Sequence, residues 1–178
     1  MARIPYADIE AEATRDLVDR MAAERGSVLH LYRMLLHSPP VAEGWLGFLT
    51  AIRQQSGLDD RTRELVIMRV AALNQAAYEA DQHRPIALAA GLTEAQLSQI
   101  LQLDPVSLFA PQDRTVIALT DAMTRDVRIA DALMSRVREY FDERGVIELV
   151  ATIGAYNMVS RFLVALDVQS SDRPGAAC

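Results

Sequence analysis

The stretch ELVIMRVAALNQAAYEADQH, residues 64–83, carries the pattern that most strongly indicates both the fold and a site. It combines an apolar helical segment with two glutamates and one histidine. Glu79 and His83 are four residues apart, so on a helix they lie on one face, one turn apart. Glu64 belongs to the preceding apolar segment, and the polar pair formed by Asn74 and Gln75 predicts a helix break between the two segments. We therefore expect the three side chains to converge on one site.

The composition is that of one ordinary globular domain. The chain has 178 residues, of which 51% are hydrophobic and 24% charged, enough to bury a core without disulfides. The net charge of -6 gives no basic field, so we expect no nucleic-acid partner. The single cysteine, Cys178, has no partner for an internal disulfide, which favours a reducing, cytoplasmic location. Residues 1–16 contain no apolar run of signal-peptide length, so we do not expect export.

Helical periodicity runs along almost the whole chain, and no strand pair or hairpin signal interrupts it. Glycines, prolines and capping residues divide the chain into helices expected at 7–25, 27–36, 41–55, 60–73, 75–90, 93–104, 112–125, 130–141 and 143–168. No long polar linker separates them. The sequence therefore predicts an all-α, single-domain helical bundle over residues 1–168, followed by a flexible tail over 169–178.

The spacing of Glu79 and His83 favours proton-transfer chemistry. Their helix face also presents Ala76 and Ala80, whose small side chains leave room for a ligand. A carboxylate beside an imidazole favours the charged ring and can hold one tautomer. The same spacing also fits a surface pair that only stabilises the helix.

Glu64 lies in a helix whose other residues are mostly apolar. A carboxylate there is expected near the helix N-terminus, paired with a cation, or functional. Arg61, Arg63 or Arg69 could neutralise it, and the sequence does not decide between them.

The most apolar region, residues 145–168, contains a second polar pair. Asn157 and Arg161 are four residues apart, and we expect them to bind substrate, with Arg161 holding a carboxylate. Arg161 could equally bridge Glu148 or Asp167, or lie in a subunit interface. Charges at these positions favour a buried helix over a membrane span, so we expect no membrane partner.

Metal and cofactor sites are not expected. The sequence has no cysteine cluster and no His-x-x-x-His pair, and Glu79 with His83 would supply only two ligands. A small-molecule substrate is the partner that this pattern favours.

The quoted stretch resembles the carboxymuconolactone decarboxylase and alkylhydroperoxidase D superfamily. The resemblance covers roughly residues 35–168 and rests on RELVIMRVAALNQAAYEADQH, on the following AGLTEAQL and on YNMVSRFLVALDV near the end. It implies an all-α bundle of the alkylhydroperoxidase D type that forms homo-oligomers. It also implies that Glu64 matches the relay glutamate of that family and His83 its distal histidine.

The chain departs from the redox members of this family at their cysteine pair. The two cysteine positions read Ala76 and Glu79, and Tyr78 stands where those members have a histidine. Reduction of a peroxide by a dithiol needs one thiol to attack and a second to resolve. Peroxiredoxin-like antioxidant activity is therefore a disfavoured alternative.

The decarboxylase branch needs no cysteine pair. The resemblance implies a lyase with cofactor-free acid–base chemistry: decarboxylation, or a related lactone or enol reaction, on a small carboxylate-bearing compound. We expect His83, assisted by Glu79 or Glu64, to donate the proton, and Tyr78 or Asn74 to stabilise the oxyanion. A non-catalytic ligand-binding or scaffold protein with the inherited fold is the other alternative.

Overall fold

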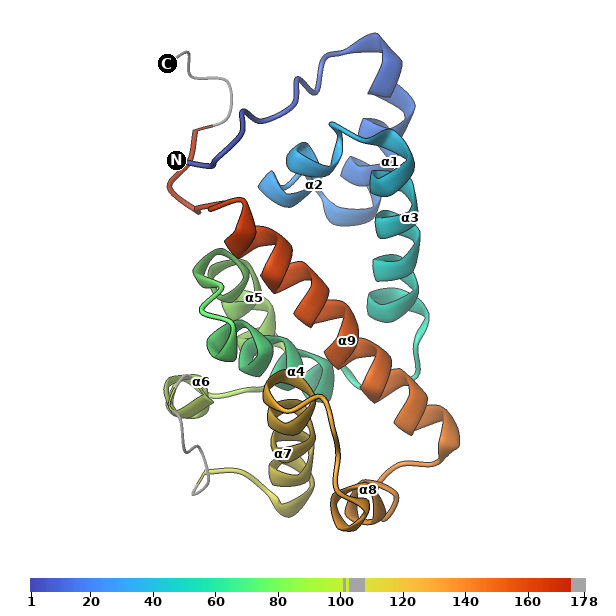
Figure 1. The fold of residues 1–178 in the computed structure, drawn as a ribbon, viewed down its shortest axis with the longest axis vertical. Coiled ribbons are helices and arrows are strands. Elements are labelled where there is room, and N and C mark those ends of the chain that lie inside the picture. The colour runs from blue at the N-terminus through green and yellow to red at the C-terminus, as the bar shows by residue number, and fades with distance from the viewer. Residues whose placement is uncertain (101, 103–107, 174–178) are drawn as a thin grey trace. The chain divides into compact units, whose positions relative to one another are not determined.

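The computed structural model describes residues 1–100, 102 and 108–173, and these residues form helices and connecting turns with no strand (Figure 1). The predicted all-α class is therefore confirmed. The chain divides into two compact units, one made of residues 1–55 with the segment from residue 166 onward, and one made of residues 56–165. The single domain expected from the sequence stays a prediction.

The first unit contains three helices and two shorter helical turns. They are listed in chain order as η1 (Glu12–Thr14, a 3-10 turn), α1 (Arg15–Arg25), α2 (His30–Leu35), α3 (Pro39–Thr50) and η2 (Ala51–Gln55, a π-helical turn). The first helix begins at Arg15, later than the sequence predicts, because the preceding residues form only the 3-10 turn. Gly26 ends α1 in the left-handed conformation, with φ 79°.

The C-terminal segment of this unit is tied to its N-terminal segment. The Tyr6 hydroxyl donates to Asp172 Oδ2 at 2.7 Å, and Asp172 is buried. These contacts belong to the first residues of the predicted tail. Residues 174–178, including Cys178, lie outside the described residues, and the flexibility predicted for 169–178 stays a prediction.

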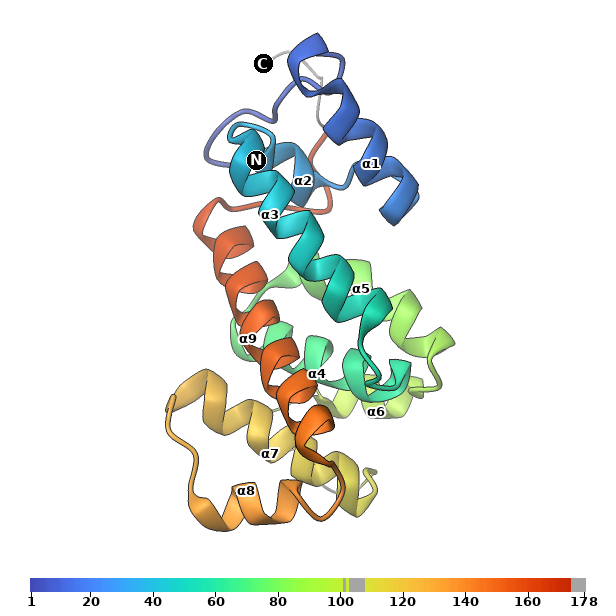
Figure 2. The ribbon, with the colours of Figure 1, turned by 90° about the vertical axis from the view of Figure 1, so that its right-hand side faces the viewer.

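The second unit contains six helices. They are listed in chain order as α4 (Asp60–Leu73), α5 (Ala77–Ala89), α6 (Glu94–Ile100), α7 (Pro111–Arg125), α8 (Asp131–Val137) and α9 (Glu143–Ala165). The central helix is α4, which packs against α5, α7 and α9. Every residue from 62 to 71 is buried, so the apolar stretch predicted to form a core helix does so. Figure 2 shows α7 and α8 together at one end of this unit.

Two arginine–aspartate pairs join α4 to α7. Arg61 donates to both oxygens of Asp113 at 2.7 and 2.9 Å, and Arg69 donates to both oxygens of Asp121 at 2.7 Å each. Both pairs join residues 52 positions apart, so α4 and α7 run parallel and in register. Two of the three arginines that could neutralise Glu64 are therefore bound to α7.

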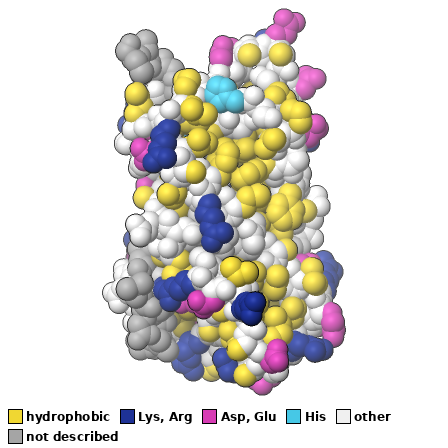
Figure 3. All heavy atoms as spheres, viewed as in Figure 1, with side chains coloured by type: hydrophobic (Ala, Val, Ile, Leu, Met, Phe, Trp, Pro, Cys, Tyr) yellow, Lys and Arg dark blue, Asp and Glu magenta, His cyan; other side chains and the backbone are white. Residues whose placement is uncertain are grey.

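The longest helix, α9, has an apolar core face. Leu149, Ile153, Tyr156 and Leu163 are buried on it, while Ile147 is exposed. By length and composition α9 could cross a membrane, and half of its most apolar window is buried. Figure 3 shows arginine and acidic side chains intermixed on the surface near α7 and α8, so neither positive nor negative charge predominates on this part of the surface.

Candidate active site

A tight reversal between α4 and α5 brings the candidate residues together. Asn74 is the C-cap of α4, and Ala76 is the N-cap of α5. Gln75 between them adopts a left-handed conformation with φ 55°, which few residues other than glycine or asparagine favour. The helix break predicted at Asn74 is therefore confirmed, and α5 packs back against α4.

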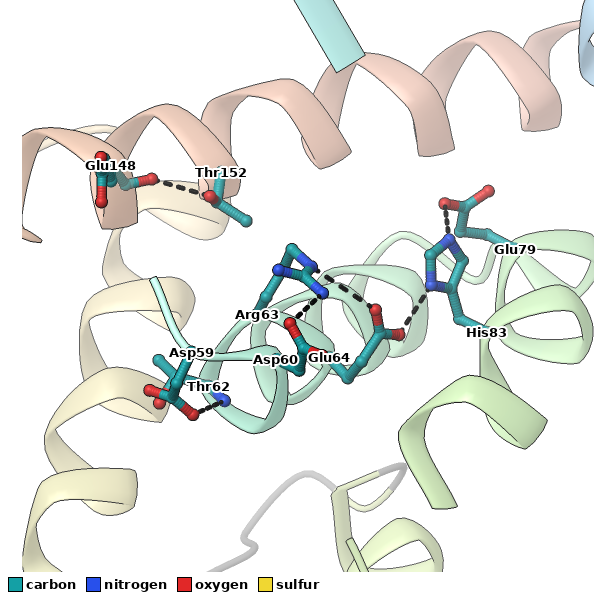
Figure 4. Close-up of polar contacts among 9 residues, drawn as sticks. All are labelled: Asp59, Asp60, Thr62, Arg63, Glu64, Glu79, His83, Glu148 and Thr152. Carbon is teal, nitrogen blue, oxygen red and sulfur yellow. Dashed lines mark hydrogen bonds and ion pairs between the residues drawn. The ribbon is translucent and has the colours of Figure 1, made fainter. Parts of the chain in front are cut away.

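The reversal places His83 between two carboxylates (Figure 4). His83 Nδ1 lies 2.7 Å from Glu64 Oε2, a hydrogen-bond distance. His83 Nε2 lies 3.4 Å from Glu79 Oε1, a longer ion-pair contact within α5. The exposed fractions of Glu64, Glu79 and His83 are 1%, 4% and 4%, so the three groups interact away from bulk water. The expected convergence is present, and the surface-pair interpretation of Glu79 and His83 is wrong.

The arrangement needs one more proton than a neutral imidazole carries. A neutral ring has one N–H donor, whereas two carboxylates here face both ring nitrogens. Both contacts are hydrogen-bonded only if His83 carries protons on both nitrogens, or if one carboxyl group is protonated. These two states differ only in the position of a single proton between His83 and a glutamate. Such an arrangement can hold one proton that is carried either by His83 or by a glutamate.

Arg63 is the cation beside Glu64. Its Nε lies 3.8 Å from Glu64 Oε1, and its Nη2 donates to Asp60 Oδ1 at 2.7 Å. Arg63 is buried, and among the described residues its Nε makes no hydrogen bond. The sequence offers three arginines as possible partners of Glu64, and the structure places Arg63 beside it.

The structure adds Tyr156 to the site. Its ring lies 5.4 Å from the His83 ring between centroids, edge to face at 90°, and Tyr156 is 1% exposed. This contact restricts the orientation of the imidazole. Sequence reasoning missed Tyr156, because a tyrosine at core spacing on a long apolar helix has no signal that separates it from a packing residue. Tyr78 is also buried, next to Glu79 on α5, and its role stays a prediction.

The remaining predicted residues gather around Thr124 on α7. Asn74 Nδ2 donates to Asn157 Oδ1 at 3.0 Å, and Asn157 Nδ2 donates to Thr124 Oγ1 at 2.9 Å. Arg161 is exposed and donates to the Thr124 carbonyl at 3.4 Å. These bonds join the C-terminal end of α4 to α7 and α9. Substrate binding by Asn74, Asn157 and Arg161 stays a prediction, and each already has a structural partner.

Known proteins share both the sequence pattern and the fold. The model of the carboxymuconolactone decarboxylase family matches residues 39–122, which include Glu64, Glu79 and His83. The uncharacterized protein YdfG of Bacillus subtilis is 28% identical over 122 residues, covering 67% of this chain and 83% of YdfG.

Two solved structures superpose on almost the whole chain. The uncharacterized peroxidase-related protein of Ralstonia eutropha JMP134, an alkylhydroperoxidase AhpD core, has a TM-score of 0.82 at 16% identity, over 96% of this chain and 93% of its own. The debrominase Bmp8, as a cysteine-to-alanine variant with 2,3,4-tribromopyrrole, has a TM-score of 0.75 at 16% identity, over 96% and 91%. These likenesses show the shared fold. Residues 39–122 thus match the carboxymuconolactone decarboxylase family, and the chain shares the fold of alkylhydroperoxidase D-like proteins, with Ala76 and Glu79 in place of a cysteine pair.

Proposed function

We propose that this protein catalyses cofactor-free acid–base chemistry on a small oxygenated compound, with Glu79, His83 and Glu64 as one proton relay. The proposal rests on the position of His83 between the carboxylates of Glu64 and Glu79. Both nitrogens of His83 face carboxylates, at 2.7 Å and 3.4 Å. A substrate that approached a ring nitrogen would have to displace a glutamate. Glu79, at the end with the longer contact, is therefore the group that exchanges a proton with the substrate.

The relay works in the following order. His83, protonated on both nitrogens, passes its Nε2 proton to Glu79, and Glu79 delivers this proton to the substrate carbon and becomes a carboxylate again. Glu64 keeps the remaining proton on Nδ1 and fixes that tautomer. A proton from solvent returns the ring to its starting state. In the reverse direction, Glu79 removes a proton from carbon, and the C–H electron pair moves into the enolate.

The composition of the chain restricts the chemistry further. The only cysteine is Cys178, so no dithiol can form within one chain. All 18 residues of the Lys and Arg class are arginines, so no lysine is present to form a Schiff base with a keto acid. A carbanion formed in this site must therefore be stabilised as an enol or enolate through hydrogen bonds.

Two reaction types use such a relay. One is decarboxylation, in which the carbanion left by carbon dioxide is reprotonated. The other is a proton shift in a lactone or an enol. The match of residues 39–122 to the carboxymuconolactone decarboxylase family supports both, whereas the fold by itself leaves the reaction open. The debrominase Bmp8 has the same fold and a different named activity.

The test is deuterium incorporation from heavy water into a panel of enolisable lactones, ketones and 3-oxo acids, followed by NMR together with carbon dioxide release. Wild-type protein should catalyse exchange, and His83→Gln should reduce the rate by about 10²-fold or more, the usual contribution of a general acid or base. His37→Gln is the matched control, since His37 is exposed and its ring Nε2 lies 2.8 Å from the Pro5 carbonyl rather than beside a glutamate carboxylate. Equal rates for wild-type protein and His83→Gln on every member that reacts would refute the proposal, and so would the absence of any reaction.

A further inference from the structure

A cavity of about 310 Å³ lies between α7 and the end of α8, the two helices that Figure 2 shows side by side. One face of α7, from Pro111 to Ala118, lines it, together with Arg136 of α8 and Glu139 and Tyr140 of the turn that follows. All of these residues belong to the second unit, and none of them is part of the relay. Pockets for small ligands begin at roughly 300 Å³, so the cavity has room for one small molecule.

Two arginines that line this cavity have no carboxylate partner. Most arginines among the described residues of 56–165 form an ion pair with an aspartate or a glutamate, as Arg138 does with Glu143. The side chain of Arg136 forms neither a hydrogen bond nor an ion pair with any described residue. Arg114 donates from Nη1 to the Phe109 carbonyl at 3.1 Å, and the structure gives its other N–H groups no acceptor within the described part of the chain. Repulsion between two cations in one cavity favours an anion that contacts both.

The end of α8 is held in a fixed conformation by its own backbone. The Glu139 N–H donates to the Arg136 carbonyl at 3.2 Å, and the Tyr140 N–H donates to the Val137 carbonyl at 3.1 Å. Val137 is fully buried, so this turn is anchored to the core of the unit. The wall formed by α8 is therefore present before a ligand binds, which lowers the entropic cost of binding.

The charges that line the cavity favour an anion with a single negative charge. Arg114 and Arg136 each contribute a positive charge, and Glu139 contributes a negative charge without pairing with either arginine. Although the surface near α7 and α8 carries both signs of charge (Figure 3), the cavity itself therefore has a net positive lining. The Thr115 hydroxyl donates to the Pro111 carbonyl at 3.0 Å, so the guanidinium groups are the donors that remain for a ligand.

The rest of the lining is apolar. Pro111 and Ala118 lie on the α7 side, and the exposed ring of Tyr140 lies on the other. The short side chain of Ala118 leaves space beside the arginines, and an aromatic ring can pack against Tyr140. A flat apolar group attached to the anion would therefore be accommodated.

We propose that this cavity binds a small aromatic carboxylate, with its carboxylate held by Arg114 and Arg136 and its ring against Tyr140. A planar guanidinium matches a carboxylate through two parallel hydrogen bonds. Both arginines are exposed, so each contact is partly screened by water and the binding is weak and rapidly reversible. The site lies outside the relay and does not depend on the proposed reaction.

The experiment is a titration of the whole chain with benzoate, followed through the arginine Nε–H signals in proton–nitrogen NMR spectra. We expect saturable shifts of the Arg114 and Arg136 signals. Benzamide has the same ring without the charge and should shift them far less, and inorganic phosphate should bind more weakly than benzoate because it lacks the ring. Raising the ionic strength should weaken benzoate binding, since salt screens exposed charges.

Three variants locate the site. Arg114→Gln and Arg136→Gln should each raise the Kd for benzoate by about threefold to tenfold, the effect of losing one exposed charge-assisted contact. Arg138→Gln is the matched control, since Arg138 is exposed and close in sequence to Arg136 but does not line the cavity, and its Kd should equal that of the wild type. The urea midpoints of Arg114→Gln and Arg136→Gln should stay close to that of the wild type, because neither substitution removes an ion pair within the protein.

Each other outcome would overturn the inference. Benzoate shifts that do not saturate, or a Kd that is unchanged in both Arg114→Gln and Arg136→Gln, would show that no such site exists. Equal binding of benzoate and benzamide would show an apolar groove without charge recognition. Tighter binding of phosphate than of benzoate would assign the cavity to a phosphate-bearing ligand. The relay is tested separately, by His83→Gln.

Discussion

Glu64 Oε2 lies 2.7 Å from Nδ1 of His83, although the two residues belong to different helices and both are buried. The contact depends on the reversal at Gln75, which folds α5 back against α4. It fixes which ring nitrogen faces Glu64, and thereby leaves Nε2 for Glu79. In the proposed relay the two glutamates therefore have different roles: Glu64 orients and stabilises the ring, and Glu79 exchanges the proton.

Replacing Glu64 by glutamine tests the orienting role. The glutamine amide keeps the volume and can still accept from Nδ1, but it carries no charge to stabilise a protonated ring. We expect Glu64→Gln to slow deuterium exchange by about tenfold to a hundredfold, since relay groups of this kind contribute at most a few orders of magnitude. The rate is measured on whichever panel member reacts, with Glu94→Gln as the control because Glu94 is exposed and pairs with exposed Arg84. An unchanged rate in Glu64→Gln would remove Glu64 from the relay.

The pair formed by Arg69 and Asp121 should contribute strongly to stability. Arg69 is 1% exposed, and it also donates to the carbonyls of Ile100 and Gln102. Replacing Asp121 by alanine leaves a buried cation without its carboxylate. We expect a loss of about 3–5 kcal/mol in the free energy of unfolding, measured by urea denaturation.

The corresponding substitution in the pair formed by Arg61 and Asp113 provides a comparison for Asp121→Ala. Asp113→Ala removes the partner of Arg61, whose side chain is 31% exposed, so water replaces part of the lost interaction. Its effect should be clearly smaller than that of Asp121→Ala. If Asp121→Ala and Asp113→Ala lower the free energy of unfolding by the same amount, the burial of Arg69 does not determine how much its ion pair contributes to stability.

Glu148 gives the protein a pH-dependent contact. Its carboxylate accepts from Arg144 Nε at 2.8 Å and from the Gly57 N–H at 2.9 Å, and these hydrogen bonds lower its pKa from the ordinary value of 4.5. In the unfolded chain the carboxylate binds a proton more readily. The contact therefore contributes stability that is fully present above pH 4.5 and is lost as the pH falls through the lower pKa of the folded state.

The measurement is the urea midpoint of unfolding between pH 6 and pH 3. We expect the wild-type midpoint to fall more steeply below about pH 4.5 than that of Glu148→Gln, which lacks the titrating group. Glu143→Gln, at an exposed position on the first turn of α9, should keep the wild-type slope. The account of this contact fails if Glu148→Gln and wild-type protein lose stability with the same slope.

Asn157 should behave as a structural residue. It is buried, and its amide joins Asn74 to Thr124 and to the Ile153 carbonyl. We expect Asn157→Ala to lower the free energy of unfolding by about 1–3 kcal/mol, because it leaves buried polar partners unsatisfied. Arg161→Ala, at an exposed position, should change it by less than about 0.5 kcal/mol. A substrate-binding role for Asn157 would appear as a raised KM in a variant whose unfolding curve matches that of the wild type.

Much of the fold is predictable from local signals. Glycine, proline and capping residues mark helix ends that the structure reproduces closely, as at Asp60–Leu73 and Pro111–Arg125. The convergence of Glu64 with His83 is predictable as well, since a helix break between two amphipathic segments favours an antiparallel return. The start of the first helix at Arg15 is not predictable from composition, because the Ala7 N–H donates to the Arg33 carbonyl and residues 12–14 form a 3-10 turn.

Long-range polar partners are the part that the sequence does not determine. Three arginines on α4 are equivalent candidates for Glu64 in the sequence, and only the packing of α7 shows that Arg61 and Arg69 have other partners. The contact of Tyr156 with His83 and that of Thr124 with Asn157 likewise depend on how the helices pack. Their helical spacing places them in the core, and the spacing alone does not say which polar group they meet.

The most direct test of the central claim follows the three groups of the relay together. The side-chain carboxyl carbons of Glu64 and Glu79 and the ring nitrogens of His83 are recorded by NMR as a function of pH, in the wild-type protein and in Glu79→Gln. If the three groups share one proton, their signals change with common inflections, and Glu79→Gln alters the curve of His83 while leaving those of His30 and His37 as they were. Independent curves for the three groups, with a His83 curve that is the same in Glu79→Gln, would contradict the relay.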